Sequence, residues 1–399
     1  MTQEFKINDD DLVIIQNHAY KLSNLPADLK FQLVQKLQSN NDQAYTKPDI
    51  SKIFNLNDFE PIAQKLLTPE TYAYYRTGAE DEITLRENQK AFKRIYFKPR
   101  VLKSVSKISL ETSVLGSYSS LPFYITAFHG ASFDGNNEGE LPLAKSAGKY
   151  DLIQMIPGLS TIPLKQQVQS HGNVEVDQWL QVYLRESFDE VLEKIKKAEE
   201  TGKIKAIFFT VDVAQLGRRE HESRIRDRSD YVKVPQLASD LNWDDLIKIR
   251  QSTNLKIILK GIQSVEDAIK SVELGFEGFV ISNHGGRQLD TTRSSIEVLG
   301  EIVPELKKRN LYHKTEILID GGVRRGSDII KALALGAKSV GLGRPFLYAL
   351  QTYGEEGISK VIDILREELT ITLKLLGVVK LEELNETFVD TIDLYRNRA

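Results

Sequence analysis

The chain has 399 residues, of which 41% are hydrophobic, so it can bury a sizeable core as one large domain with an appendage. Its 53 lysines and arginines nearly balance 56 aspartates and glutamates, and no overall field favours nucleic acid or an anionic membrane as a partner. The lack of cysteine excludes disulfides, thiolate metal sites and a cysteine nucleophile, and we predict no metal site.

The N-terminal region, residues 1–55, is rich in charged and amide side chains, and we interpret it as a small appendage to a domain at 56–399. The first residues, Met1 to Phe5, do not form a cationic, apolar signal, and no later apolar stretch is long enough to span a bilayer. The last three residues are not a peroxisomal tripeptide. We expect a soluble intracellular protein in the cytoplasm, with the mitochondrion and the peroxisome as open alternatives.

The chain from Asn57 onward has a helical pattern, in which Thr68 is a helix N-cap and Pro69 the first helical position. Beyond residue 120, short β-branched runs alternate with amphipathic helical patterns. The predicted strands are Phe123–Ala127, Leu152–Ile156, Leu180–Leu184, Ala206–Asp212, Lys256–Lys260, Gly278–Ser282, Glu316–Asp320 and Ser339–Leu342.

Most of these strands are followed by a helical pattern. Clear examples are Ser187–Gly202, Ser264–Gly275, Ser295–Asn310 and Ser327–Gly336. A strand followed by a helix, repeated eight times, predicts the α/β class and a (β/α)8 TIM barrel with a small N-terminal appendage. A doubly wound open sheet is the structural alternative.

Catalytic groups of such barrels lie where the strands end, at the C-terminal face. Nearly every predicted strand of this chain ends in a hydrogen-bonding or charged group. The residues at the strand ends include Thr126, Ala127, Gln181, Tyr183, Thr210, Asp212, Lys260, Ser282, Asp320, Gly322, Gly343 and Arg344. A barrel kept for stability alone has less reason to end its strands in this way.

The most specific stretch is Ser282-Asn283-His284-Gly285-Gly286-Arg287-Gln288-Leu289-Asp290. Histidine has the side-chain pKa nearest neutrality, and an arginine can clamp a carboxylate with two hydrogen bonds, so His284 and Arg287 suit proton abstraction from an acid. Asp212 could hold His284 in one orientation. An isolated His-x-x-Arg pattern is most often a solvated loop, but the flanking glycines and the preceding strand favour a catalytic interpretation.

Two further features indicate anion binding. Lys260 closes an apolar strand, so its ammonium either points into the barrel mouth beside an anion or extends to bulk water. The loops Asp320–Gly326 and Gly341–Pro345 place glycine amides and arginines after the last two strands, where barrels commonly bind phosphate. Glycines that serve only tight turns are the alternative explanation.

At these residues the sequence resembles the FMN-dependent 2-hydroxy-acid dehydrogenases and oxidases, from about Asn57 to about Leu384. The stretch around His284 matches the family signature. Other matching motifs are Tyr74–Ala79, Thr210–Asp212, Leu216–Glu220, Leu259–Gly261, Asp320–Gly326 and Gly341–Tyr348. The resemblance implies FMN as cofactor, a small 2-hydroxy acid as substrate, with L-lactate favoured, and a homotetramer.

The resemblance also implies catalytic roles. Arg287 and Tyr74 would bind the substrate carboxylate, and Tyr183 would bind its hydroxyl. His284 would remove a proton during oxidation to the 2-keto acid, and Asp212 would stabilise the imidazolium. Arg219 would support this site, and the electrons would pass to oxygen or to a separate acceptor.

The implied cofactor contacts involve the remaining strand ends. Lys260 would stabilise the negative charge of the reduced flavin ring. The other implied cofactor-binding residues are Gln181, Thr210 and Ser282 for hydrogen bonds to the ring, Ala127 for backbone contact, Gly322, Arg324, Gly343 and Arg344 for the phosphate, and in addition Thr126 and Asp320.

The sequence departs from the family at several places. Pro157 stands where relatives carry a serine, which removes a hydroxyl and a backbone donor. The loop Phe128–Glu140 is bulkier and the segment between Arg219 and Trp243 shorter, so we expect a reshaped pocket and a more open site. A yeast member carries an N-terminal haem domain, whereas residues 1–55 lack a His-Pro-Gly-Gly motif and are interpreted as a possible remnant of one.

Two other functions fit part of these observations. The departures at Pro157 and Phe128 suit an FMN-binding paralogue with little or no turnover. A barrel enzyme with a phosphorylated substrate and no flavin fits the phosphate loops, but it leaves Lys260, Gln181 and Tyr74 without a purpose.

Overall fold

The computed structural model describes residues 45–170, 176–183, 188–226 and 241–395. One unit of the chain runs from Ile50 to the C-terminus. The predicted appendage, residues 1–55, lies almost entirely outside the described residues, so the appendage and its interpretation as a haem-domain remnant stay predictions. Leu184, the predicted end of the third strand, and most of the segment between Arg219 and Trp243 also lie outside them.

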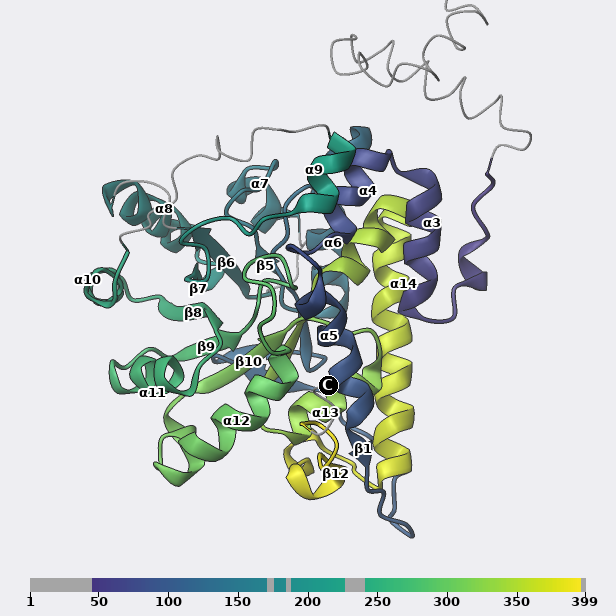
Figure 1. Cartoon of the computed structure of the whole chain (residues 1–399), viewed down its shortest axis with the longest axis vertical. Coiled ribbons are helices and arrows are strands. Elements are labelled where there is room, and N and C mark those ends of the chain that lie inside the picture. Colours follow the sequence, from purple (N-terminus) through teal and green to yellow (C-terminus); the bar gives the residue numbers. More distant parts are fainter. Residues whose placement is uncertain (1–44, 171–175, 184–187, 227–240, 396–399) are drawn as a thin grey trace, which may run out of the picture. The chain divides into compact units, whose positions relative to one another are not determined.

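Eight parallel strands form the central sheet (Figure 1). They are β4 (Phe123–Ile125), β5 (Met155–Ile156), β6 (Gln178–Tyr183), β7 (Ile204–Thr210), β8 (Lys256–Ile262), β9 (Gly278–Ile281), β10 (Glu316–Asp320) and β11 (Ser339–Leu342). The spatial order is β4-β11-β10-β9-β8-β7-β6-β5.

The sheet closes on itself between its first two strands. A parallel bridge joins Ile125 to Gln154, and the Ile125 amide donates to the Ile153 carbonyl at 3.1 Å. The predicted (β/α)8 barrel is therefore confirmed, and the open-sheet alternative is wrong because an open sheet would leave these two edges unpaired.

Helices follow each strand on the outside of the barrel. They are α6 (Leu141–Tyr150), α7 (Leu164–Gln169), α8 (Phe188–Glu200), α9 (Glu220–Arg226), α10 (Trp243–Gln251), α11 (Val265–Glu273), α12 (Ser295–Lys308), α13 (Gly326–Ala334) and α14 (Arg344–Leu376). The predicted barrel helices agree with these bounds to within about two residues. Serines 264 and 294 cap α11 and α12 by accepting backbone N–H groups.

In the described chain from residue 45 onward, three helices precede the barrel: α3 (Phe59–Leu66), α4 (Pro69–Arg76) and α5 (Ile83–Lys90). Helix α4 begins as predicted, with Pro69 first and the Thr68 hydroxyl accepting from the Thr71 amide at 3.3 Å. Two short pairings complete the described strands, namely β1 (Tyr96–Phe97) with β12 (Val389–Asp390) and β2 (Thr112–Val114) with β3 (Ser117–Ser119). Short 3-10 turns lie at Ile50–Lys52, Leu56–Asp58, Ala91–Arg94, Phe133–Gly135, Tyr312–Lys314, Leu381–Glu383 and Glu386–Phe388.

The barrel interior is packed with side chains at its N-terminal end. Tyr124, Trp179 and Phe208 form an aromatic cluster there, in which Trp179 lies 5.0 Å from Tyr124 and 4.8 Å from Phe208 between ring centroids. The β2–β3 hairpin covers this end: Leu115 joins the same buried cluster, its amide donates to Glu316 Oε2 at 2.7 Å, and its carbonyl accepts from Lys256. The open end of the barrel is therefore the C-terminal one, where the predicted site residues lie.

Helix α14 lies along α3, α6 and α13 (Figure 1). It contains a kink at Gly354, whose φ of 61° and ψ of -138° lie in a region that is essentially restricted to glycine. The helix ends at Gly377, which takes the left-handed conformation expected of a glycine C-cap. The turns before the kink follow β11 and contact α3, through Tyr348 with Glu60 and Tyr353 with Phe59.

Candidate active site

A cavity of about 460 Å³ opens at the C-terminal ends of the strands. Its volume lies within the usual range for small-molecule and cofactor sites. The predicted site residues that line it are Tyr74, Thr126, Ala127, Tyr183, Arg219, Lys260, His284, Arg287, Asp320, Gly322, Arg324, Gly343 and Arg344. Four others are not part of this lining: Asp212 contacts His284, Ser282 contacts Asp320, and Gln181 and Thr210 contact each other.

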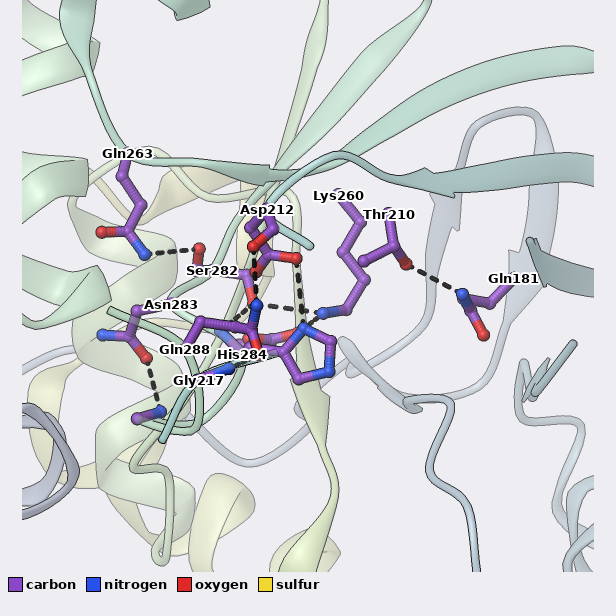
Figure 2. A network of polar contacts seen from close by, with 12 residues as sticks. Gln181, Thr210, Asp212, Gly217, Lys260, Gln263, Ser282, Asn283, His284 and Gln288 are labelled. Carbon is purple, nitrogen blue, oxygen red and sulfur yellow. Dashed lines mark hydrogen bonds and ion pairs between the residues drawn. The ribbon is translucent and has the colours of Figure 1, made fainter. Parts of the chain in front are cut away.

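His284 is held in one orientation at the cavity (Figure 2). Its Nδ1 lies 3.1 Å from Asp212 Oδ1, and its backbone amide donates to Ser282 Oγ at 3.1 Å. The backbone is left-handed at His284, Gly285 and Gly286, with φ of 57°, 67° and 75°. This tight turn brings the imidazole back toward Asp212 and leaves Nε2 as the ring nitrogen that can accept a proton.

The charges around His284 prepare it to act as a base. Burial lowers its pKa, the negative charge of Asp212 raises it, and Lys260 lowers it again, so the net pKa lies below the ordinary histidine value. Burial alone would raise the pKa of Asp212, but the attraction and hydrogen bond of His284 and the charge of Lys260 lower it. At neutral pH the pair is therefore a neutral imidazole beside a carboxylate.

Lys260 is buried beside an internal anion. Its Nζ lies 3.6 Å from Asp320 Oδ2 and 3.3 Å from Ser282 Oγ, while Ser282 Oγ donates to Asp320 Oδ1 at 2.5 Å. Burial lowers the pKa of Lys260, but the charges of Asp320 and Asp212 outweigh it and the net pKa is raised. The lysine is a fixed cation at the cavity wall, and the alternative of an ammonium in bulk water is wrong.

Arg287 and Tyr74 are in direct contact in the cavity wall. Arg287 Nη1 donates to the carbonyls of Tyr74 at 2.5 Å and Thr77 at 3.0 Å, and its guanidinium lies 4.8 Å from the Tyr74 ring centre. Both N–H groups of Nη1 thus have a partner, and Nη2 lies 3.9 Å from Glu222 Oε2. The Arg287 side chain is only 13% exposed, so its charge acts in a partly desolvated space.

Sequence reasoning missed two charged residues of the cavity wall, Glu222 and Arg226 on α9. Glu222 lies one helical turn after Arg219, and Arg226 lies one turn after Glu222. This i, i+3 and i, i+4 spacing was the signal available in the sequence. It was not recognised because α9 is short and follows an irregular stretch after β7.

The wall near Thr126 suits a polar ligand. Thr126 Oγ1 is buried and has no hydrogen-bond partner in the described part of the chain, which is costly unless a ligand or water satisfies it. Gln181 Nε2 donates to Thr210 Oγ1 at 2.8 Å, and Gln181 Oε1 accepts from the Gly158 amide at 3.2 Å. Gln181 and Thr210, which are both predicted to contact the cofactor, are therefore bonded to each other, and Gln181 is also bonded to the loop that contains Pro157.

The loops after β10 and β11 form a glycine-rich wall. A Cβ at Gly322, where φ is 84°, would lie 2.0 Å from the Asn88 carbonyl oxygen, so no larger residue fits. Arg344 lines the cavity and also donates to the carbonyls of Tyr75 at 2.8 Å, Gly285 at 2.8 Å and Thr77 at 3.2 Å. Burial lowers its pKa to about 10. Arg324 also lines the cavity, and its Nη1 donates to the Val323 carbonyl at 3.0 Å, so the phosphate-binding role of both arginines stays a prediction.

The bulky loop after β4 forms part of the cavity through Phe128 and His129. His129 Nδ1 lies 2.8 Å from the Leu159 carbonyl oxygen. Phe133 stacks on the ring of Tyr75 at 6.0 Å between centroids. The expected reshaping of the pocket by this loop is consistent with these contacts.

The fold and this cavity define a (β/α)8-barrel enzyme with a histidine–aspartate pair at its C-terminal face. A sequence profile described as FMN-dependent dehydrogenase matches residues 63–235 and 227–391, so the chain belongs to the FMN-dependent dehydrogenase family. Membership supports the flavin interpretation over a flavin-free barrel enzyme with a phosphorylated substrate.

Relatives of known activity agree with this assignment. The chain is 42% identical over 370 residues to an L-lactate dehydrogenase (cytochrome) of Wickerhamomyces anomalus, covering 88% of this chain and 64% of that protein. It is 39% identical over 366 residues to a peroxisomal (S)-2-hydroxyacid oxidase of Arabidopsis thaliana, covering 86% and 98%. The chain thus spans less than two thirds of the L-lactate dehydrogenases (cytochrome) that it matches. The share is 64% for the Wickerhamomyces anomalus protein and 61% for the Saccharomyces cerevisiae protein.

Solved structures show the same likeness. The recombinant flavin-binding domain of baker's yeast flavocytochrome b2 superposes with a TM-score of 0.86 at 39% identity, covering 94% of each chain. A mandelate oxidase variant superposes with a TM-score of 0.76 at 31% identity, covering 85% of this chain and 98% of that one. The likeness covers the barrel and its loops.

Proposed function

We propose that this protein is an FMN-dependent oxidase or dehydrogenase that converts an L-2-hydroxy acid, with L-lactate favoured, to the 2-keto acid. The observation that carries the proposal is the 3.1 Å contact of His284 with Asp212 in a cavity shared with Arg287, Tyr183 and Lys260. The names of the relatives, which include L-lactate dehydrogenase and (S)-2-hydroxyacid oxidase, support the substrate class.

The residues of the cavity have complementary tasks in this reaction. Arg287 and Tyr74 bind the substrate carboxylate, and Arg219 adds positive charge beside them. Burial raises the pKa of Tyr183, so its phenol stays protonated and can donate to the substrate. His284 Nε2 accepts a proton from the substrate, and Asp212 stabilises the imidazolium that forms through Nδ1.

The cavity wall fits FMN. The unsatisfied Thr126 hydroxyl, the fixed cation Lys260 and the glycine wall at Gly322 and Gly343 are the groups that a polar, anionic, planar ligand requires. Arg324 and Arg344 would hold the phosphate, and Lys260 would face the negative charge of the reduced ring. When bound, FMN accepts the two electrons that the substrate loses, and these electrons then pass to oxygen or to a separate acceptor.

Anaerobic mixing of FMN-loaded protein with 2-hydroxy acids tests this function. We expect the oxidised-flavin band near about 450 nm to bleach with L-lactate, and comparison with glycolate and longer acids ranks the substrates. Admission of air then shows whether oxygen is the acceptor. A protein that retains FMN and stays yellow with every acid would instead be the FMN-binding paralogue with little turnover.

We also propose a homotetramer, a cytoplasmic location and a division of the chain into an appendage at 1–55 and a barrel at 56–399. Among the described helices, none combines the length and the apolar character that crossing a membrane requires. Light scattering of the purified protein measures the assembly, and limited proteolysis followed by mass spectrometry finds the boundary. A tagged copy imaged against cytoplasmic, mitochondrial and peroxisomal markers tests the location.

A further inference from the structure

Glu222 is a carboxylate inside the cavity to which the proposed reaction assigns no role. Its side chain is 10% exposed, and it lies among three arginines of the same cavity wall. Arg226 Nη1 lies 3.4 Å from its Oε1, whereas Arg287 Nη2 and Arg219 Nη1 lie 3.9 and 4.0 Å from its Oε2. One internal negative charge thus faces three guanidinium groups.

The Oε2 oxygen of Glu222 is held by charge and not by hydrogen bonds. It is buried and has no hydrogen-bond partner within the described ranges, and distances of 3.9 and 4.0 Å are too long for one. Arg287 is meanwhile fixed by the carbonyls of Tyr74 and Thr77. A carboxylate oxygen held this weakly can yield its place to a better partner.

We propose that Glu222 is an internal counter-ion that competes with the substrate carboxylate for Arg219 and Arg287. This proposal rests on the proposed function, in which Arg287 binds the substrate carboxylate. In the empty site Glu222 offsets part of the positive charge of both arginines. When a carboxylate enters, it takes these two guanidinium groups, and Glu222 keeps Arg226 as its partner.

The competition has a consequence for affinity. Substrate and product each carry one carboxylate, so Glu222 weakens the binding of both and favours release of the 2-keto acid. Glu222 therefore sets the affinity of the site for carboxylates, because every carboxylate that binds Arg219 and Arg287 must displace it. Arg226 limits the competition, because it holds Oε1 at 3.4 Å.

The test is a binding titration of the oxidised, FMN-loaded protein with pyruvate and with oxalate. The change in flavin absorbance reports the binding and gives Kd for each anion. Glu222→Gln removes the competing charge, and we expect Kd for both anions to fall about tenfold, which corresponds to about 1.4 kcal/mol. The control is Glu220→Gln on the same helix, which removes the same charge from a residue paired with Arg218 and Arg224. We expect its Kd values to equal those of the unaltered protein.

A second variant gives the opposite sign and does not depend on Glu222→Gln folding. Among the described residues, Arg226→Gln leaves Glu222 with Arg219 and Arg287 as its ion-pair partners, so we expect Kd for pyruvate and oxalate to rise severalfold. Its control is Arg224→Gln, which removes an exposed guanidinium from the same helix without effect on Kd. A Kd that rises or stays unchanged in Glu222→Gln would overturn the proposal, as would tighter binding in Arg226→Gln.

These outcomes remain separate from those that bear on the proposed function. Binding of pyruvate and oxalate needs no turnover, so the counter-ion can be tested even if no 2-hydroxy acid bleaches the flavin. Failure of the bleaching experiment alone contradicts the proposed function, and unchanged Kd values alone contradict the role of Glu222.

Discussion

The residues of the site owe their chemical properties to their neighbours. His284 is a neutral base because burial and Lys260 lower its pKa more than Asp212 raises it. Lys260 remains charged because Asp320 lies 3.6 Å away. The position of both residues at strand ends was readable from the sequence, whereas the identity of the anion beside Lys260 was not, since Asp320 follows sixty residues later on another strand.

Replacement of Asp212 by asparagine tests the orientation and charge of the base. A neutral amide at this position would neither raise the pKa of His284 nor hold its Nδ1–H as the carboxylate does. We expect kcat/KM to fall about 10²- to 10⁴-fold, as when a catalytic histidine loses its carboxylate.

The pH dependence of kcat/KM gives a second test of the pair. In the unaltered protein kcat/KM should fall as pH drops through the pKa of His284, below about 6.5, because the protonated ring cannot accept a proton.

In Asp212→Asn this acid limb should move to still lower pH, because the charge that raises the pKa of His284 is gone. The profile is measured by steady-state kinetics with L-lactate between about pH 4.5 and 8, a range in which ordinary histidines titrate. An acid limb that stays in place or moves upward would contradict this account of the pair.

At the scale of elements, the loop after β4 and helix α4 form one unit. Asp134 accepts from the Thr68 amide at 2.9 Å, from the Thr68 hydroxyl at 2.7 Å and from the Thr71 hydroxyl at 2.8 Å. The Tyr75 hydroxyl donates to the Gly130 carbonyl at 2.6 Å. The helix start at Pro69 was predictable from local sequence, but its attachment to residue 134 depends on a contact sixty-six positions apart.

Asp134→Ala should loosen α4, which carries Tyr74. We expect a loss of about 1–2 kcal/mol in the free energy of unfolding, as for a helix cap, with a severalfold higher KM and a smaller change in kcat. Denaturant unfolding and steady-state kinetics measure the two effects. Asp267→Ala is the matched control, because Asp267 accepts a bond from Ser264 at the start of α11. A similar KM in both variants would contradict the role of Asp134.

The kink in α14 depends on one backbone position. A Cβ added at Gly354 would have no atom within 4 Å, so a side chain there meets open space and only backbone strain matters. We expect Gly354→Ala to destabilise the protein by about 1–3 kcal/mol in denaturant unfolding. Gly202→Ala, at a φ of 65° and also in open space, should cost less. A more stable Gly354→Ala protein would show that the helix straightens without cost.

At the scale of the whole molecule, the barrel leaves one end open to a ligand. The β2–β3 hairpin covers the N-terminal end through Leu115, and the cavity lies at the other. FMN at about 100 times its Kd should therefore add about 2.7 kcal/mol to the free energy of unfolding and raise Tm by several degrees. Calorimetry of the apoprotein with and without FMN measures this shift. Riboflavin, which lacks the phosphate, should stabilise less, and equal stabilisation would contradict a phosphate site at Gly322 and Arg324.

The sequence by itself determined the (β/α)8 class, most strand and helix positions and the residues at the strand ends, because apolar periodicity and capping are local properties of the chain. Only the tertiary structure decided which of these side chains meet. It closed the barrel between Ile125 and Gln154, bonded Arg344 to the carbonyl of Tyr75 in α4, and placed Glu222 among three arginines. Such contacts depend on strand order and loop paths over long sequence separations, which local patterns do not encode.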